Sequence, residues 1–170
     1  MGIVTAFRDL RTVRALLTGA EAEARRGGEP APGPEHLLLA AAALPDGTAA
    51  AALARVGIDR ERLRRAVEAA HAEALTSVGV VAAPGEPALR GPATGPMRST
   101  PQAQQVFRAA VAAAKAARSP LRGAHVVAAV CDLERGTAAR ALAALGVDRA
   151  ALRDATSAAP SGGSARACER

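Results

Sequence analysis

The chain has 170 residues, a length that suits one domain or two small fused halves. Its hydrophobic content is 49%, mostly alanine, with two Phe and no Tyr or Trp, and its formal net charge is +6. Strands favour β-branched and aromatic residues, so this composition argues against a β-sandwich and predicts an all-α protein whose helices pack closely.

The basic charge admits nucleic-acid binding as an alternative function, because a basic surface attracts phosphate. Acidic residues lie among the arginines in most helices, as in Asp59-Arg60-Glu61-Arg62. The chain has neither a long single-sign run nor an aromatic stacking platform, so nucleic-acid binding is the weaker hypothesis.

Four helices are predicted in the first part of the chain. Leu10, Val13, Leu17 and Ala20 recur at helical spacing, and Gly27-Gly28 ends that first helix. The second helix begins at Pro34, which suits a first helical turn, and runs through Leu44. A third helix covers about 48–56 and ends at a glycine, and a fourth follows with Asp59 as its N-cap.

An internal repeat then predicts the second half. The segment Gly47–Ala54 recurs as Gly136–Ala143, and Val56–Arg60 recurs as Leu145–Arg149. In the same register His36 aligns with His125. We therefore expect Thr100 to cap a helix that Pro101 opens, a second helix to hold His125, and Asp148 to cap the last one.

The repeat gives a domain plan. We expect repeat 1 at 1–76, a Pro/Gly-rich linker at 77–99, repeat 2 at 100–158 and a disordered tail at 159–170. Cys131 lies in an apolar helical run and is predicted to be a small core residue, and it shares no metal or redox spacing with Cys168. No apolar run approaches the roughly 18 residues of a membrane span, so a cytoplasmic location is expected.

The ordered motifs resemble a known family. Pro34-Glu35-His36-Leu37-Leu38-Leu39, the Gly47–Leu53 helix start and the Val56–Asp59 turn are similar to the Clp repeat, and Ser99–Ala103 resembles the opening of its second copy. Two such repeats form the N-terminal domain of Clp unfoldases, especially the ClpC type. The resemblance covers about residues 8–158 and implies a pseudo-twofold bundle of eight helices.

The resemblance also implies a function. The family's N-terminal domains recruit substrates and adaptors, those of the ClpC type bind phosphorylated arginine, and several cyclic-peptide antibiotics target them. On this basis Glu35 and His36 are the candidates for a phosphoarginine-like site. Alanine at 124 replaces the motif glutamate of the second repeat, so a second such site is not expected. In the first repeat Pro34 replaces a threonine, which removes a hydroxyl and an amide that could help hold phosphate.

The family analogy places the opening helices of the two repeats side by side. Their exposed faces predict a peptide groove formed by Phe7, Leu17, Glu21, Gln104 and Arg108. The alternative interpretation is an ordinary polar surface around a core seam. For Glu35 the alternative is a helix-dipole charge, and for His36 and His125 it is a structural tie between helix and loop.

Catalytic motifs are absent from the sequence. A P-loop needs Gly-x-x-x-x-Gly-Lys, whereas the only lysine follows Ala114, and neither Gly-x-Ser-x-Gly nor His-Glu-x-x-His occurs. His71 is placed on a charged, solvated helix face. We therefore expect no enzyme activity, no cofactor and no metal.

The leading hypothesis is a stand-alone Clp-repeat protein that binds peptides, degrons or adaptors and so modulates a Clp protease. A narrower version is a decoy that sequesters a Clp-directed cyclic-peptide antibiotic. The alternatives are a basic nucleic-acid-binding regulator and a degenerate repeat that serves as an interaction scaffold.

Overall fold

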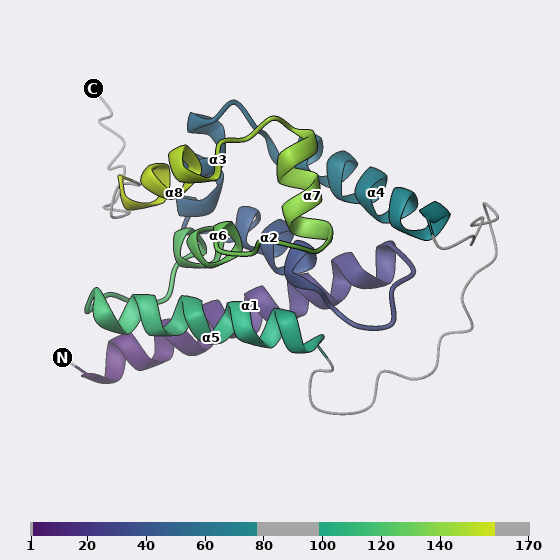
Figure 1. Cartoon of the computed structure of the whole chain (residues 1–170). Coiled ribbons are helices and arrows are strands. Elements are labelled where there is room, and N and C mark those ends of the chain that lie inside the picture. Colours follow the sequence, from purple (N-terminus) through teal and green to yellow (C-terminus); the bar gives the residue numbers. More distant parts are fainter. Residues whose placement is uncertain (1, 78–98, 159–170) are drawn as a thin grey trace, which may run out of the picture.

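The computed structural model describes the backbone of residues 2–77 and 99–158, and the side chains from residue 9 onward within those ranges. These residues form eight helices and no strand, four on each side of the undescribed segment (Figure 1). The predicted all-α fold is confirmed, while nearly all of the predicted linker and the predicted tail lie outside the described residues. The helices are α1 (Gly2–Arg26), α2 (Pro34–Ala42), α3 (Thr48–Arg55), α4 (Arg60–Ser77), α5 (Pro101–Ala116), α6 (Gly123–Cys131), α7 (Thr137–Ala144) and α8 (Arg149–Ser157).

The repeated Gly-x-Asp motif builds the same turn twice. Gly57 and Gly146 have φ of +74° and +70°, a backbone conformation that glycine adopts without a Cβ penalty. Each donates its N–H three residues back, and the next residue donates five residues back, which closes the preceding helix in a Schellman motif. Asp59 and Asp148 then accept an N–H of the following helix at 2.7 and 2.8 Å. Both aspartates are the predicted N-caps.

Helices of each repeat pack against helices of the other repeat. Helix α4 of the first repeat packs on α7 of the second, and α8 of the second packs on α3 of the first, while α2 and α6 lie at the centre (Figure 1). This pairing is unchanged when the repeats are interchanged, so the bundle has pseudo-twofold symmetry. Leu38, Leu53 and Leu142 are fully buried, and Cys131 is buried as predicted. Neither repeat covers its own apolar faces without the other.

A hydrogen-bonded cap from the first repeat holds the start of α6. Asp46 Oδ2 accepts the N–H of Gly123 at 2.9 Å, and Thr48 Oγ1 accepts the N–H of Ala124 at 3.0 Å. An added Cβ at Gly123 would lie 2.8 Å from the Cβ of Ala49, so only glycine permits this approach. The first N–H groups of a helix have no partner inside it, and here the other repeat satisfies them.

The start of α2 needs no equivalent cap from the second repeat. Pro34 stands at the position of Gly123 in the first repeat and has no N–H, and Arg135 stands at the position of Asp46. The cap between repeats therefore runs in one direction only, which makes the pseudo-twofold arrangement asymmetric in sequence.

Helices α1 and α5 run antiparallel along one side of the molecule (Figure 1). Thr100 caps α5 as predicted, accepting the N–H of Ala103 at 3.2 Å, and its own N–H donates to the Pro32 carbonyl at 2.9 Å. Asp9 on α1 accepts the N–H of Leu121, which follows α5, at 2.9 Å. Among the described helices none is long and apolar enough to cross a membrane.

Candidate binding site

A pocket of about 230 Å³ opens between α1 and α5. Its walls come from Leu17 and Ala20 on α1 and from Ala103 and Phe107 on α5, with Pro32 closing one side. Leu17 and Phe107 are partly buried against the core, so they present apolar surface to the pocket while remaining fixed by packing. The combination of an apolar lining with a few polar groups is typical of a ligand site.

Three of the five predicted groove residues line this pocket: Leu17, Gln104 and Arg108. Glu21 does not line it, and instead pairs with Arg25 one helical turn away at 3.2 Å. The side chain of Phe7 lies outside the described residues.

The sequence prediction did not include the aromatic side chain that lines the pocket. Phe107 lies between the predicted positions Gln104 and Arg108, and Phe is rare in this chain, with only two copies. An aromatic residue on the predicted groove face of α5 was therefore a usable signal. Pro32 could not have been found in this way, because it reaches the pocket through the loop before α2.

The predicted pair Glu35 and His36 lies at the start of α2, and both side chains are buried, at 5% and 2% exposure. Glu35 Oε1 lies 3.2 Å from His36 Nδ1, and that same nitrogen accepts the N–H of Gly33 at 2.9 Å. An added Cβ at Gly33 would lie 1.8 Å from Glu35 Oε1, so the carboxylate folds back over the glycine. Neither Glu35 nor His36 lines the α1–α5 pocket.

The rings of His36 and a second histidine, His71, contact the same carboxylate oxygen. Its Nε2 lies 3.3 Å from Glu29 Oε1, and His71 Nδ1 lies 3.3 Å from the same oxygen. The sequence interpretation of His71 as a solvated surface residue is therefore incomplete, because its side chain is only 32% exposed and faces Glu29. The contact joins α4 to the loop before α2, which periodicity alone does not show.

Burial opposes a charge on His36, but the Glu29 and Glu35 carboxylates outweigh burial and raise its pKa to about 9. Burial also raises the pKa of Glu29, but His36 and His71 outweigh it and hold the value below its ordinary one. Nδ1 cannot accept from Gly33 and donate to Glu35 at once. A neutral ring makes the first contact and a protonated ring makes the second, so the charge state of His36 selects its partner.

The second repeat provides a natural comparison. His125 Nδ1 accepts the N–H of Arg122 at 3.1 Å, as His36 does from Gly33, but Ala124 supplies no carboxylate. Burial lowers the pKa of His125, and the charge on Arg122 lowers it further. The two histidines thus share a structural role at a helix start, as the structural alternative predicts, and differ in charge environment.

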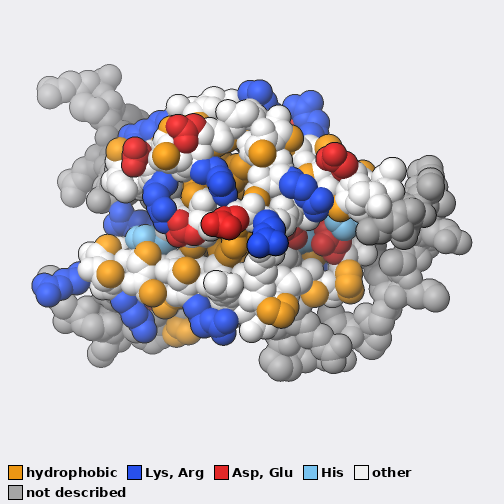
Figure 2. Space-filling model, viewed as in Figure 1, with side chains coloured by type: hydrophobic (Ala, Val, Ile, Leu, Met, Phe, Trp, Pro, Cys, Tyr) orange, Lys and Arg blue, Asp and Glu red, His pale blue; other side chains and the backbone are white. Residues whose placement is uncertain are grey.

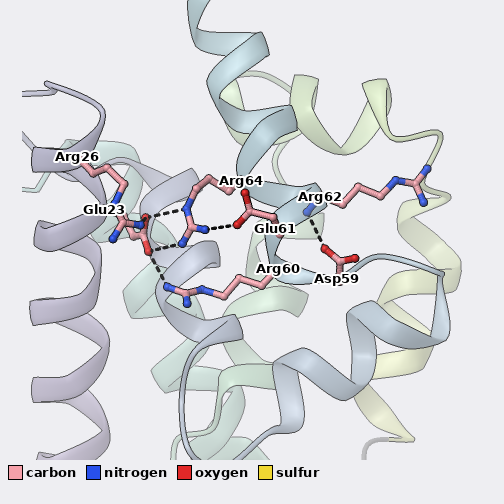
Figure 3. Close-up of polar contacts among 7 residues, drawn as sticks. All are labelled: Glu23, Arg26, Asp59, Arg60, Glu61, Arg62 and Arg64. Carbon is pink, nitrogen blue, oxygen red and sulfur yellow. Dashed lines mark hydrogen bonds and ion pairs between the residues drawn. The ribbon is translucent and has the colours of Figure 1, made fainter.

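A second pocket, of about 250 Å³, lies between the end of α1, α2 and α4, and His36 and His71 contribute to it. At its edge Glu23 is 7% exposed and faces three arginines (Figure 3). Arg60, Arg26 and Arg64 approach its carboxylate at 2.7, 3.0 and 3.1 Å. Burial raises the pKa of Glu23, but the arginines outweigh it and hold the value low. This cluster ties α1 to α4.

One group of possible metal ligands occurs among the described residues: Glu29, Glu35 and His36, whose ligand atoms lie within 4.8 Å of one another. Both ring nitrogens of His36 are already engaged, Nδ1 with the Gly33 N–H and Nε2 with Glu29. A histidine that binds a metal through one nitrogen carries its proton on the other. In the neutral ring, Nδ1 accepts from Gly33 and Nε2 donates to Glu29, so neither nitrogen is free to bind a metal ion.

Comparison with known proteins agrees with the helical plan. Residues 11–90 match the family model described as the Clp repeat (R) N-terminal domain. Among solved structures, the fold is similar to the N-terminal domain of the caseinolytic protease associated chaperone ClpD from Arabidopsis thaliana, with a TM-score of 0.54. That likeness covers 89% of this chain and 90% of that chain at 20% sequence identity. No curated protein matches the chain.

The helical fold is that of a Clp-repeat domain. Residues 11–90 carry a Clp repeat N-terminal domain, and the eight described helices form two tandem four-helix repeats in one bundle.

Proposed function

We propose that the protein is a non-catalytic binding module that takes peptide segments in the groove between α1 and α5. The segments would be degrons, adaptors or Clp-directed cyclic-peptide antibiotics, and their capture would modulate or protect a Clp protease. The observation that carries the proposal is the apolar pocket at this seam, where the family resemblance places a ligand groove.

The chemistry of the pocket supports a peptide ligand. Leu17 and Phe107 offer a fixed apolar contact for one or two side chains. Gln104 and Arg108 supply polar groups at the rim, where a peptide backbone or carboxylate can hydrogen-bond. Anchors of this kind contribute most of the binding energy in small interfaces.

The proposal keeps Glu35 and His36 as a phosphoarginine-like site of the first repeat only. A guanidinium that pairs with Glu35 would replace His36 Nδ1 as the partner of the carboxylate, now 3.2 Å away. Because Glu35 is 5% exposed, this binding would require its side chain to turn outward. Glu35→Ala should abolish phosphoarginine binding, and an unchanged affinity would remove this part of the proposal.

Calorimetry with a Clp-directed cyclic peptide and with a leucine-rich degron-type peptide tests the main proposal. Leu17→Ala and Phe107→Ala should each weaken binding about tenfold, as loss of an anchor does. Leu145→Ala is the matched control, because Leu145 is also partly buried against the core but lies at the end of α7. Absence of binding at micromolar concentrations, or equal effects of Leu17→Ala and Leu145→Ala, would contradict the proposal.

A further inference from the structure

The positive charge of the chain is concentrated in two segments. Residues 9–20 and 99–131 contain six basic residues and one acidic residue, a formal net charge of +5 out of +6 for the whole chain. The stretch 99–131 contains no Asp or Glu. Elsewhere acidic and basic residues nearly balance, as around Glu23.

The fold brings these two segments together. They are the middle of α1 and the region from α5 through α6, and residues of α1 and α5 line the same pocket. The single acidic residue, Asp9, is engaged with the backbone N–H of Leu121 at 2.9 Å. In Figure 2 the side chains over α5 are blue, orange and white, whereas red ones lie over the elements above it.

Helical spacing places the charges along the groove. Arg108 lines the pocket, and Lys115 follows it by two turns, so it lies on the same side of α5. On α1, Arg14 precedes the pocket residue Leu17 by three positions and shares its side. All three basic side chains belong to exposed residues. They therefore extend beyond the pocket toward the start of α1.

An apolar strip runs between these charges. Val13 and Val111 are partly buried next to the pocket and pack against the core. Leu10, one further turn toward the start of α1, is the exposed large hydrophobic residue of the described chain, at 65% exposure. The surface is thus an apolar strip with basic flanks, longer than the pocket itself.

We infer that the preferred partner of this groove is an acidic peptide segment with leucine-like side chains spaced between its carboxylates. This inference rests on the proposed function and adds the charge of the ligand. The apolar side chains would occupy the strip from Leu17 to Leu10, and the carboxylates would face Arg14, Arg108 and Lys115. Complementary charge speeds association and rejects partners of the wrong sign.

Fluorescence anisotropy with three labelled peptides of about twelve residues tests the inference. Each has the same leucines, with intervening positions all Asp/Glu, all Lys, or all Gln/Ser. The acidic peptide should bind about tenfold more tightly than the neutral one at about 50 mM salt, since each exposed ion pair changes affinity by about 1.5- to 5-fold. The difference should shrink at about 200 mM salt.

A charge-reversed variant provides the decisive arm. Arg14→Glu combined with Lys115→Glu should weaken the acidic peptide and strengthen the lysine peptide, while the neutral peptide is unchanged. Arg62→Glu with Arg140→Glu, exposed on α4 and α7, is the matched control for net charge. A response of the control equal to that of the groove variant would overturn the inference.

The outcomes separate the inference from the proposed function. Equal affinity for all three peptides, with loss on Leu17→Ala, overturns the acidic preference and keeps the peptide groove. No binding of any peptide refutes both. A labelled DNA duplex that binds as tightly as the acidic peptide and competes with it would show a general polyanion surface, and that result overturns the inference.

Discussion

The cap between the repeats can be tested by removing Asp46. In Asp46→Ala the N–H of Gly123, a buried residue, loses its acceptor at 2.9 Å, and Thr48 loses the two contacts its N–H and hydroxyl make with the same carboxylate. A hydrogen bond to a charged group contributes about 1.5–3 kcal/mol, and loss of a capping side chain costs about 1 kcal/mol. We expect the free energy of unfolding to fall by about 2–4 kcal/mol, which corresponds to a Tm lower by about 5–15 °C.

Urea unfolding followed by far-UV circular dichroism measures this loss. Arg135→Ala is the matched control, since Arg135 is exposed and holds the equivalent position in the second repeat. It should change stability by less than about 0.5 kcal/mol. Asp46→Asn keeps one acceptor oxygen and should fall between the two. If Asp46→Ala is no more destabilising than Arg135→Ala, the cap does not hold the repeats together.

Three further predictions concern the first repeat. Because the pKa of His36 is raised to about 9, the stability that its charge contributes is fully present below pH 6.5 and is lost as pH rises through about 9. An NMR titration should place the pKa of His36 above 8 and that of His125 below 6.5. A His36 pKa under 7 would contradict the role of its carboxylates. Gly33→Ala should cost about 2 kcal/mol or more in the natural chain but much less together with Glu35→Ala, because the added Cβ meets that carboxylate; equal costs in both backgrounds would refute the clash. Glu23→Gln should cost about 3 kcal/mol, and since the pKa of Glu23 is lowered, the natural chain should lose this advantage as pH falls below 4.5, which acid unfolding of both proteins checks.

Much of the fold was predictable because local signals coincide with the tertiary structure. The Gly-x-Asp motif closes one helix and caps the next, so its two copies mark the same turn in both repeats. Thr100 and Pro101 act within one helical turn and are equally visible in the sequence. The lining of the α1–α5 pocket was predictable in part, since half-buried Leu17 and exposed Gln104 and Arg108 lie on two helices that the family resemblance pairs.

The remaining features depend on contacts between distant segments. Glu29 lies between His36 and His71 only because α4 packs beside the loop before α2. The Asp46 carboxylate accepts the N–H of Gly123, which lies 77 positions away in the sequence. No single run of the chain is strongly basic, and the patch exists because the fold places two acid-poor stretches, on α1 and α5, around one pocket. Periodicity and motifs do not contain this information.

The central claim is that peptides bind between α1 and α5. The most direct measurement is an NMR titration of isotope-labelled protein with the leucine-containing peptide that binds most tightly. We predict amide shift changes centred on Leu17, Ala103, Gln104 and Phe107, which weaken in Phe107→Ala. Changes centred on α7 and α8, or none at saturating peptide, would contradict the account.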